Sequence, residues 1–410
     1  MALPHIPMAA VVPSVLLLLC IGCSNAAVLE ATPSASPNMR WNISVGADEV
    51  VMNPFISGTV TLVPTNTSVY AIDLHTGLLL WKSVLTVPNT TSYACSSVGY
   101  VSACGPLVYV GCIDKVAALF ATNGTVAWTK AIPPATTPAY NPSRHVRADC
   151  TPDAPEWLFV ASFNAPLLLL SAYDGTLIRD FSDAFPGTFA KDHVHVTNER
   201  IVFLNTWTSA AARPPTVAPI GVATVGNGEL FSAAVVLDRL SMEVAYIIGN
   251  AVNLLVDDHS HQLFVRFSVN TTQTVVAYHL GTGALRWSAS EPGLFATFDY
   301  FSNNGRLFMA TSMVNDAYPN NLTAYNASTG EVLWKQVIGF FYLLAGDEAV
   351  FAMGTVTHTK AYAAATGEIL WENGAVAVND GAVGDGAVVF GTSTGILALD
   401  IANNGTVSTL

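Results

Sequence analysis

Two histidine pairs are the side chains whose type and spacing fit metal binding. His193 and His195 are separated by one residue, and on a β-strand such residues project from the same face. Neutral imidazoles that share a face are suitable ligands for a divalent metal ion, so His193 and His195 are candidate metal ligands. A polar strand face without a ligand is the competing interpretation and the commoner one. His259 and His261, in Asp-Asp-His-Ser-His-Gln, fit a turn instead.

A short segment from Arg144 to Asp149 concentrates charge in a chain where only 11% of the residues are charged. Arg144 and Arg147 could bind an anionic ligand there, although a structural ion pair beside Cys150 is the interpretation we favour. The sequence contains no nucleophile elbow, P-loop, dinucleotide-binding glycine fingerprint or zinc-protease helix. We therefore assign no catalytic residue, and the balance favours a protein that is not an enzyme.

The elements that would position these side chains are short β-strands arranged in repeats. Apolar residues make up 51% of the chain and occur in short runs broken by Gly, Asn, Asp, Thr and Pro. The segment from Val69 to Trp81 contains the frame Ala-x-Asp-x-x-Thr-Gly-x-x-x-Trp, and this frame recurs along the chain. Its well-preserved positions are Asp73, Gly77, Trp81, Gly124, Trp128, Gly283, Trp287, Gly330, Trp334, Gly367, Trp371 and Asp400.

Two copies of the repeat are degraded. One keeps Gly175 but has Arg179 where the tryptophan belongs. The other has Met242 in place of the glycine and Tyr246 in place of the tryptophan. Both are still spaced as members of the series, so we count them as repeats.

Each position of the motif has a structural role. Asp73 can accept hydrogen bonds from the N–H groups of a turn, and Gly77 allows a positive φ there. Trp81 lies on the returning strand, where its ring can fill the gap between neighbouring sheets. Because the tryptophan recurs in every well-preserved copy, docking between sheets is favoured over a carbohydrate-binding or quinone-binding platform.

The spacing of the repeats predicts the fold. Gly77 and Gly124 lie 47 residues apart, as do Gly283 and Gly330, which suits one four-stranded sheet per repeat. We predict an all-β protein, a β-propeller of about eight four-stranded blades. The strand around Trp41 has no Ala-x-Asp frame before it, so we expect it to pair with the last repeat and close the ring. Seven blades is the alternative, if the degraded fourth repeat is an insertion.

Two segments lengthen the repeats. Residues 207–229 contain a Pro/Ala stretch unsuited to a central strand, and we expect them to form a protruding loop. We expect a similar extension from Pro133 to Pro155. Long loops on a rigid scaffold often carry binding function, and a tolerated insertion is the equally weighted alternative. The partners that we expect to bind through loops are proteins or glycans.

The N-terminus has the features of a secretory signal. An apolar core spans Val11 to Ile21, and small residues precede Ala27. We predict a signal peptide at residues 1–26, a linker at 27–37 and the propeller at 38–410, with no membrane span in the mature chain. Cys20-Ile-Gly-Cys23 also permits a bacterial lipoprotein box ending at Cys23, which we rank second because Cys20 occupies the usual leucine position.

Export makes disulfide bonds and glycans relevant. Once the signal is removed, an even number of cysteines remains, which predicts two disulfides among Cys95, Cys104, Cys112 and Cys150. Three connectivities are open, and the spacing fits no zinc-binding box. The chain also has eight Asn-x-Ser/Thr sequons, at Asn42, Asn66, Asn89, Asn123, Asn270, Asn321, Asn326 and Asn404. This excess over chance favours a glycosylated secreted or lumenal protein, although asparagine is also a good turn residue.

Net charge limits the class of partner. The formal charge is −13 and there is no run of basic residues. An acidic protein of this kind is not expected to bind nucleic acid or an anionic membrane.

The motif resembles the repeat of the pyrroloquinoline-quinone (PQQ-like) superfamily over nearly all of the mature chain. That superfamily contains quinoprotein dehydrogenases and also cofactor-free propellers, such as an outer-membrane assembly lipoprotein. The dehydrogenases have adjacent cysteines over the quinone and a calcium site beside a catalytic aspartate. No two cysteines are adjacent here, and that calcium constellation maps onto no segment of this chain.

Three functions follow from this resemblance and from the residues. The first is a secreted or lumenal, non-enzymatic scaffold that binds a protein or a glycan and needs no cofactor. The second is a quinone- or metal-dependent dehydrogenase that uses the channel mouth, with PQQ and calcium as cofactors. The third is an envelope assembly factor similar to the bacterial lipoprotein.

Overall fold

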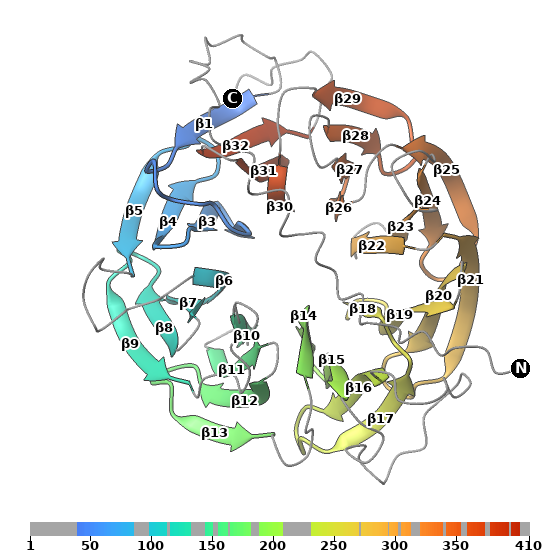
Figure 1. The fold of residues 1–410 in the computed structure, drawn as a ribbon, viewed down its shortest axis with the longest axis horizontal. Coiled ribbons are helices and arrows are strands. Elements are labelled where there is room, and N and C mark those ends of the chain that lie inside the picture. Colours follow the sequence, from blue (N-terminus) through green and yellow to red (C-terminus); the bar gives the residue numbers. More distant parts are fainter. Residues whose placement is uncertain are drawn as a thin grey trace, which may run out of the picture. The chain divides into compact units, whose positions relative to one another are not determined.

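The computed structural model describes most of the compact unit Asn38–Leu410. The described residues are 39–85, 98–112, 115–132, 144–150, 155–162, 165–181, 188–207, 231–269, 272–293, 295–301, 305–312, 320–338, 342–353, 359–373, 378–392 and 395–401. Their regular elements are all β-strands, which form eight four-stranded antiparallel sheets. The sheets follow one another around a ring, as the blades of a propeller (Figure 1). The predicted all-β fold with eight blades is confirmed, and the seven-blade alternative is wrong because the degraded fourth repeat forms a complete blade.

The first four blades follow chain order from the innermost to the outermost strand. Blade one contains β2 (Phe55–Ser57), β3 (Val60–Pro64), β4 (Ser68–Asp73) and β5 (Leu79–Val84). Blade two contains β6 (Val98–Cys104), β7 (Leu107–Cys112), β8 (Lys115–Phe120) and β9 (Val126–Ala131). Blade three contains β10 (Arg144–Cys150), β11 (Pro155–Ser162), β12 (Ala165–Ser171) and β13 (Leu177–Asp180). Blade four contains β14 (Thr188–Val196), β15 (Arg200–Trp207), β16 (Phe231–Asp238) and β17 (Val244–Gly249).

The remaining blades repeat this arrangement except at the end of the chain. Blade five contains β18 (Asn253–Asp257), β19 (Gln262–Val269), β20 (Thr272–His279) and β21 (Leu285–Pro292). Blade six contains β22 (Phe295–Phe301), β23 (Arg306–Ser312), β24 (Asn320–Asn326) and β25 (Val332–Ile338). Blade seven contains β26 (Tyr342–Ala345), β27 (Ala349–Met353), β28 (Thr359–Ala363) and β29 (Ile369–Asn373). Blade eight contains β30 (Val378–Gly384), β31 (Ala387–Thr392), β32 (Gly395–Asp400) and, as its outermost strand, β1 (Met39–Ser44).

One predicted extension is wrong in part. Within Pro133–Pro155, residues 144–150 form β10, the innermost strand of blade three. The apolar residues Val146 and Ala148 are buried between blades two and three, and this burial outweighs the polar character of their neighbours. The loop expected at 207–229 lies outside the described residues after Trp207, the last residue of β15.

The buried side chains form a ring of clusters rather than one central core. Among the described residues there are eight such clusters, and each is shared by two neighbouring blades. The second and third strands of a blade are buried on both faces, as β3 and β4 are, whereas the outermost strand alternates, as β5 does. Each blade therefore depends on its two neighbours for most of its apolar burial.

The motif turn joins the third and fourth strands in blades one to seven. In blade one the Asp73 carboxylate accepts hydrogen bonds from the backbone N–H of Thr76 at 2.8 Å and from its hydroxyl at 2.7 Å. Gly77 has a φ of +72°, and its N–H donates to the Asp73 carbonyl oxygen at 2.9 Å. The turn thus fixes the point at which the chain reverses toward the tryptophan strand.

At five blade boundaries of the described structure, a tryptophan docks on the motif turn of the next blade. Trp81 donates from Nε1 to the Ala121 carbonyl oxygen of blade two at 2.7 Å. Its ring lies so close to Gly124 that an added Cβ would be 2.5 Å from Trp81 Cε3. The same contact joins four further pairs, Trp41 with Gly77, Trp128 with Gly175, Trp287 with Gly330, and Trp334 with Gly367. Glycine is needed at these positions both for its positive φ and for the space taken by the ring.

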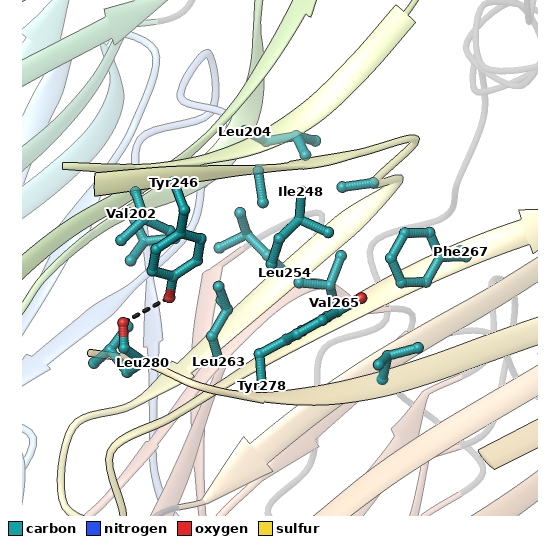
Figure 2. Packing of buried hydrophobic residues seen from close by; sticks show 14 residues of the cluster. Val202, Leu204, Tyr246, Ile248, Leu254, Leu263, Val265, Phe267, Tyr278 and Leu280 are labelled. Carbon is teal, nitrogen blue, oxygen red and sulfur yellow. Dashed lines mark hydrogen bonds between the residues drawn. The ribbon is translucent and has the colours of Figure 1, made fainter. Parts of the chain in front are cut away.

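In the two degraded repeats, other side chains make the contact with the next blade. Met242 keeps the left-handed backbone at a φ of +59°, and the preceding blade has Arg179 instead of a tryptophan. The Arg179 guanidinium donates to the Met242 carbonyl oxygen at 3.3 Å, so no indole competes with the methionine for space. Tyr246 replaces the next tryptophan, and its hydroxyl donates to the Leu280 carbonyl oxygen at 2.6 Å (Figure 2).

The ring closes through the same contact. β1 pairs antiparallel with β32, with Ile43 opposite Ile396, so blade eight contains both ends of the propeller as predicted. From this N-terminal strand, Trp41 donates to the Leu74 carbonyl oxygen of blade one at 2.8 Å. An ion pair of 2.6 Å between Arg40 and Asp400 ties the two strands of blade eight together.

A buried carboxylate holds the segment between β1 and β2 on blade one. The Glu49 side chain is only 9% exposed and accepts hydrogen bonds from Thr67, Ser68, Tyr70 and Lys82. Burial by itself would raise the pKa of Glu49, but these four donors outweigh burial and lower the pKa to about 2. The ionised form is therefore the one that the fold stabilises.

Substituting Gly124→Ala will test the docking contact. The added Cβ overlaps the Trp81 ring, so we expect the free energy of unfolding to fall by about 2–4 kcal/mol in urea denaturation. Gly305→Ala is the matched control, because Gly305 also has a positive φ of +63° but nothing lies within 4 Å of the position that its added Cβ would occupy. We expect the control to lose only about 1 kcal/mol from backbone strain. Equal losses in the two variants would contradict the docking role.

Glu49→Gln will test ring closure by its pH dependence. Because folding lowers the pKa of Glu49, the ionised carboxylate stabilises the folded state above pH 4.5. This contribution to the free energy of unfolding is lost as the pH falls toward 2. We expect the variant to unfold about 1–2 kcal/mol more easily at pH 7, because a neutral amide replaces the charged acceptor of these hydrogen bonds. The difference from wild type should shrink as the pH is lowered from 5 to 2.5. A difference that stays constant with pH would contradict this role.

Candidate functional site

A cavity of 590 Å³ lies at the innermost strands of blades three, four and five. Its lining is Arg147 of β10, His195 and Val196 of β14, Thr197 and Asn198 of the following turn, Val256 of β18, and Asp258, His259 and His261 of the turn after β18. A smaller cavity of 250 Å³ shares Arg147 and Asp258 with it and continues past Ser102 of β6 to Phe55 of β2. The innermost strands that carry these residues border the centre of the ring (Figure 1).

The site faces the same end of the propeller as the motif turns. The turn after β18 is bonded to the motif turn of its own blade, since the Leu280 N–H donates to the His261 carbonyl oxygen at 2.9 Å. The Asp257 carboxylate organises the turn after β18 by accepting from the His259 N–H at 3.0 Å and from the Ser260 hydroxyl. The strands thus bring residues of three blades to one end of the propeller.

Histidines from two different blades line the same cavity. His195 is half-buried on β14, and it lines the same cavity as His259 and His261, which lie in a turn as predicted. The side chain of His193, the other candidate metal ligand, lies outside the described part of the structure. Among the described residues, no group of three or more His, Cys, Asp and Glu side chains is arranged to hold a metal ion.

Arg147 is a residue for which the sequence left two interpretations open, an anion-binding residue and a structural ion pair. It belongs to the charged segment interpreted as a structural ion pair, but it lines both cavities. No hydrogen bond or ion pair joins its guanidinium to another residue in the described part of the chain, and desolvation by the surrounding protein lowers its pKa. The side chain is nonetheless open to solvent, because it faces the cavity. The signal available in the sequence was the concentration of charge around it.

Two of the predicted disulfide cysteines can be placed. Cys104 and Cys112 are each disulfide-bonded. In the β6–β7 hairpin, Cys104 lies opposite Leu107 and Cys112 lies opposite Val98, so the two cysteines sit at opposite ends of the hairpin. That separation exceeds the reach of one disulfide, so each has another partner. The pairing of the four cysteines stays a prediction.

The sequons differ in accessibility. Asn42 and Asn123 are exposed, whereas Asn66, Asn321 and Asn326 are half-buried. Asn326 has a structural role, since its side-chain oxygen accepts from the Ser328 N–H at 2.9 Å in a motif turn. The remaining sequons, at Asn89, Asn270 and Asn404, lie outside the described residues.

The described residues do not fit a calcium–quinone centre. No metal-binding group is found among them, and the chain has no adjacent cysteines. In the same described ranges, no helix is long and apolar enough to cross a membrane. We therefore derive no redox step from the resemblance to quinoproteins.

The strand order and the motif first define the class, an eight-bladed propeller of PQQ-like repeats. The chain belongs to the family described as outer membrane protein assembly factor BamB, whose pattern matches residues 27–165 and 271–408. The stretch between these matches contains both degraded motifs and the three histidines of the cavity.

Individual relatives are more distant. The outer membrane protein assembly factor BamB of Shewanella oneidensis is 29% identical over 160 residues, which cover 37% of this chain and 38% of that protein. The match thus spans well under half of the curated relative.

Solved structures show the same architecture. The BamB crystal structure from Moraxella catarrhalis has a TM-score of 0.60 at 11% identity and covers 90% of this chain and 98% of its own. The quinohemoprotein alcohol dehydrogenase ADHIIG of Pseudomonas putida HK5 has a TM-score of 0.62 at 13% identity, with 90% and 76% covered. At such low identity these similarities concern the fold alone.

Proposed function

We propose that this chain is a non-enzymatic scaffold that binds a partner protein along the outer edge of blade one. The observation that carries the proposal is a row of three exposed leucines, Leu78, Leu79 and Leu80, which are 66%, 53% and 52% exposed. Consecutive exposed apolar residues are unusual on a soluble protein and mark surfaces that bind other proteins.

Blade one departs from the other repeats at this edge. The residue that follows the motif glycine is Leu78 in blade one, whereas the other repeats have a smaller or polar residue there, namely Thr125, Thr176, Glu243, Ala284, Glu331 and Glu368. Val84, also exposed, lies on the same side of β5 as Leu80. The fold does not need a leucine at position 78, since the other blades form without one.

The geometry of β5 favours an extended protein segment as the partner. β5 is the outermost strand of its sheet and, among the described strands, pairs only with β4. Such an edge can add a strand from another protein, with apolar side chains of the partner packing on the leucines. Aliphatic side chains in a row suit a protein partner better than a glycan, whose surface is rich in hydroxyl groups.

A role in outer-membrane protein assembly is the second candidate, favoured by membership of the BamB family. In that case the chain works in a bacterial envelope and carries a lipid on Cys23. Under the first candidate the chain is secreted or lumenal and carries glycans at exposed sequons such as Asn42 and Asn123. Mass spectrometry of the mature protein separates the two, by a lipidated N-terminal peptide or by glycopeptides.

Photocrosslinking in the native host will test the edge of blade one. A photoreactive amino acid at Leu80 should yield one discrete protein adduct. Ile178 is the matched control, because it has the equivalent position on β13 of blade three and is 51% exposed. Leu78→Thr should reduce the yield at position 80 several-fold without changing the thermal midpoint by more than about 2 °C. No adduct at Leu80, or equal adducts at both positions, would contradict the proposal.

A further inference from the structure

We propose that the cavity of 590 Å³ at blades three to five binds a small oxyanion, a carboxylate or phosphate group, through the guanidinium of Arg147. This inference does not depend on the docking of a protein at β5. It assigns a small-molecule site to the inner strands of blades three to five, away from the outer edge of blade one.

The first argument is the uncompensated charge. The exposed guanidinium of Arg147 lines both cavities, and no ion pair or hydrogen bond joins it to another described residue. An arginine that faces a cavity without an acidic partner has its N–H donors available to the oxygens of a bound anion. The planar guanidinium matches the two oxygens of a carboxylate or a phosphate.

The second argument is the set of groups around Arg147. His259 and His261 project from the turn after β18, and Asn198 from the turn after β14. Imidazole and amide side chains can donate hydrogen bonds to the remaining ligand oxygens. Asp258 also lines the cavity and can accept a hydrogen bond from a hydroxyl or amine elsewhere on the ligand. A cavity of this volume holds a small organic acid or a phosphate ester.

The third argument is the backbone at His261. His261 has a φ of +50°, and the equivalent position in blade six is Gly305, at +63°. The equivalence follows from the same hydrogen bond, since Leu280 donates to the His261 carbonyl and Ala327 donates to the Gly305 carbonyl. A side chain costs about 1 kcal/mol in this conformation, so the fold alone favours glycine. Blade five accepts this cost and places an imidazole at the edge of the cavity.

The lining residues differ in how they relate to the family pattern. Arg147 lies inside the matched stretch 27–165, whereas the three histidines and Asn198 lie between the two matched stretches.

Binding of two probes to the full mature chain will test the site. Inorganic phosphate and succinate should each be titrated by calorimetry and by thermal unfolding, against sodium chloride at equal ionic strength. We expect at least one probe to bind at a single site and to raise the thermal midpoint. The probe that binds more tightly identifies the head group. Absence of binding by both probes would overturn the proposal.

Variants then locate the site. Arg147→Gln should weaken binding by about 10- to 100-fold, as loss of a charged hydrogen bond predicts, and should not lower the midpoint of the unliganded protein. Lys130→Gln removes one positive charge from the outer strand of blade two and should leave binding unchanged. His261→Gly should weaken binding while it preserves the fold, which keeps the test informative if the Arg147 variant does not fold. Equal binding by wild type and both cavity variants would overturn the assignment.

Discussion

The contact between a ring and a turn glycine sets the geometry of this propeller. At five blade boundaries an indole occupies the place where a glycine of the next blade would carry its Cβ. The indole also donates to a carbonyl oxygen of that same turn, so apolar contact and hydrogen bond act together. Because the buried clusters lie between blades, no blade completes its core alone. The orientation of each blade is therefore fixed by its neighbour, and Trp41 extends this rule across the closure.

The position of this contact decides which parts of a blade can vary. The outer strands carry the docking residues, which leaves the inner strands and their turns free to vary. Blade three uses this freedom to place Arg147 beside the channel, and blade five places His261 where blade six has Gly305. Blade one varies at its outer edge instead, with Leu78 after the motif glycine. Function in this fold is thus expected where a blade departs from the repeat.

The sequence predicted the repeated parts of the fold well, because their signals are local. The Asp, Gly and Trp of each motif lie within about ten residues of one another, so the frame of blade one can be recognised in the others. The cavity could not be predicted, because His195 and His259 come from different blades and meet only through the packing of the inner strands. The strand that contains Arg147 was not predicted, because the prolines on either side of it indicated a loop. The contact between Arg179 and Met242 can be recognised in the sequence, because a repeat without the motif tryptophan is followed by a repeat without the motif glycine.

The most direct test of the account is a double-mutant cycle at the boundary of blades three and four. Arg179→Trp should be destabilising alone, because the indole meets the Met242 side chain, and Met242→Gly should be destabilising alone, because it leaves a void in the cluster. Together they recreate the tryptophan–glycine contact, so the account predicts a favourable coupling energy of about 1–3 kcal/mol in urea unfolding. Strictly additive effects would contradict the claim that this contact sets the packing of the blades.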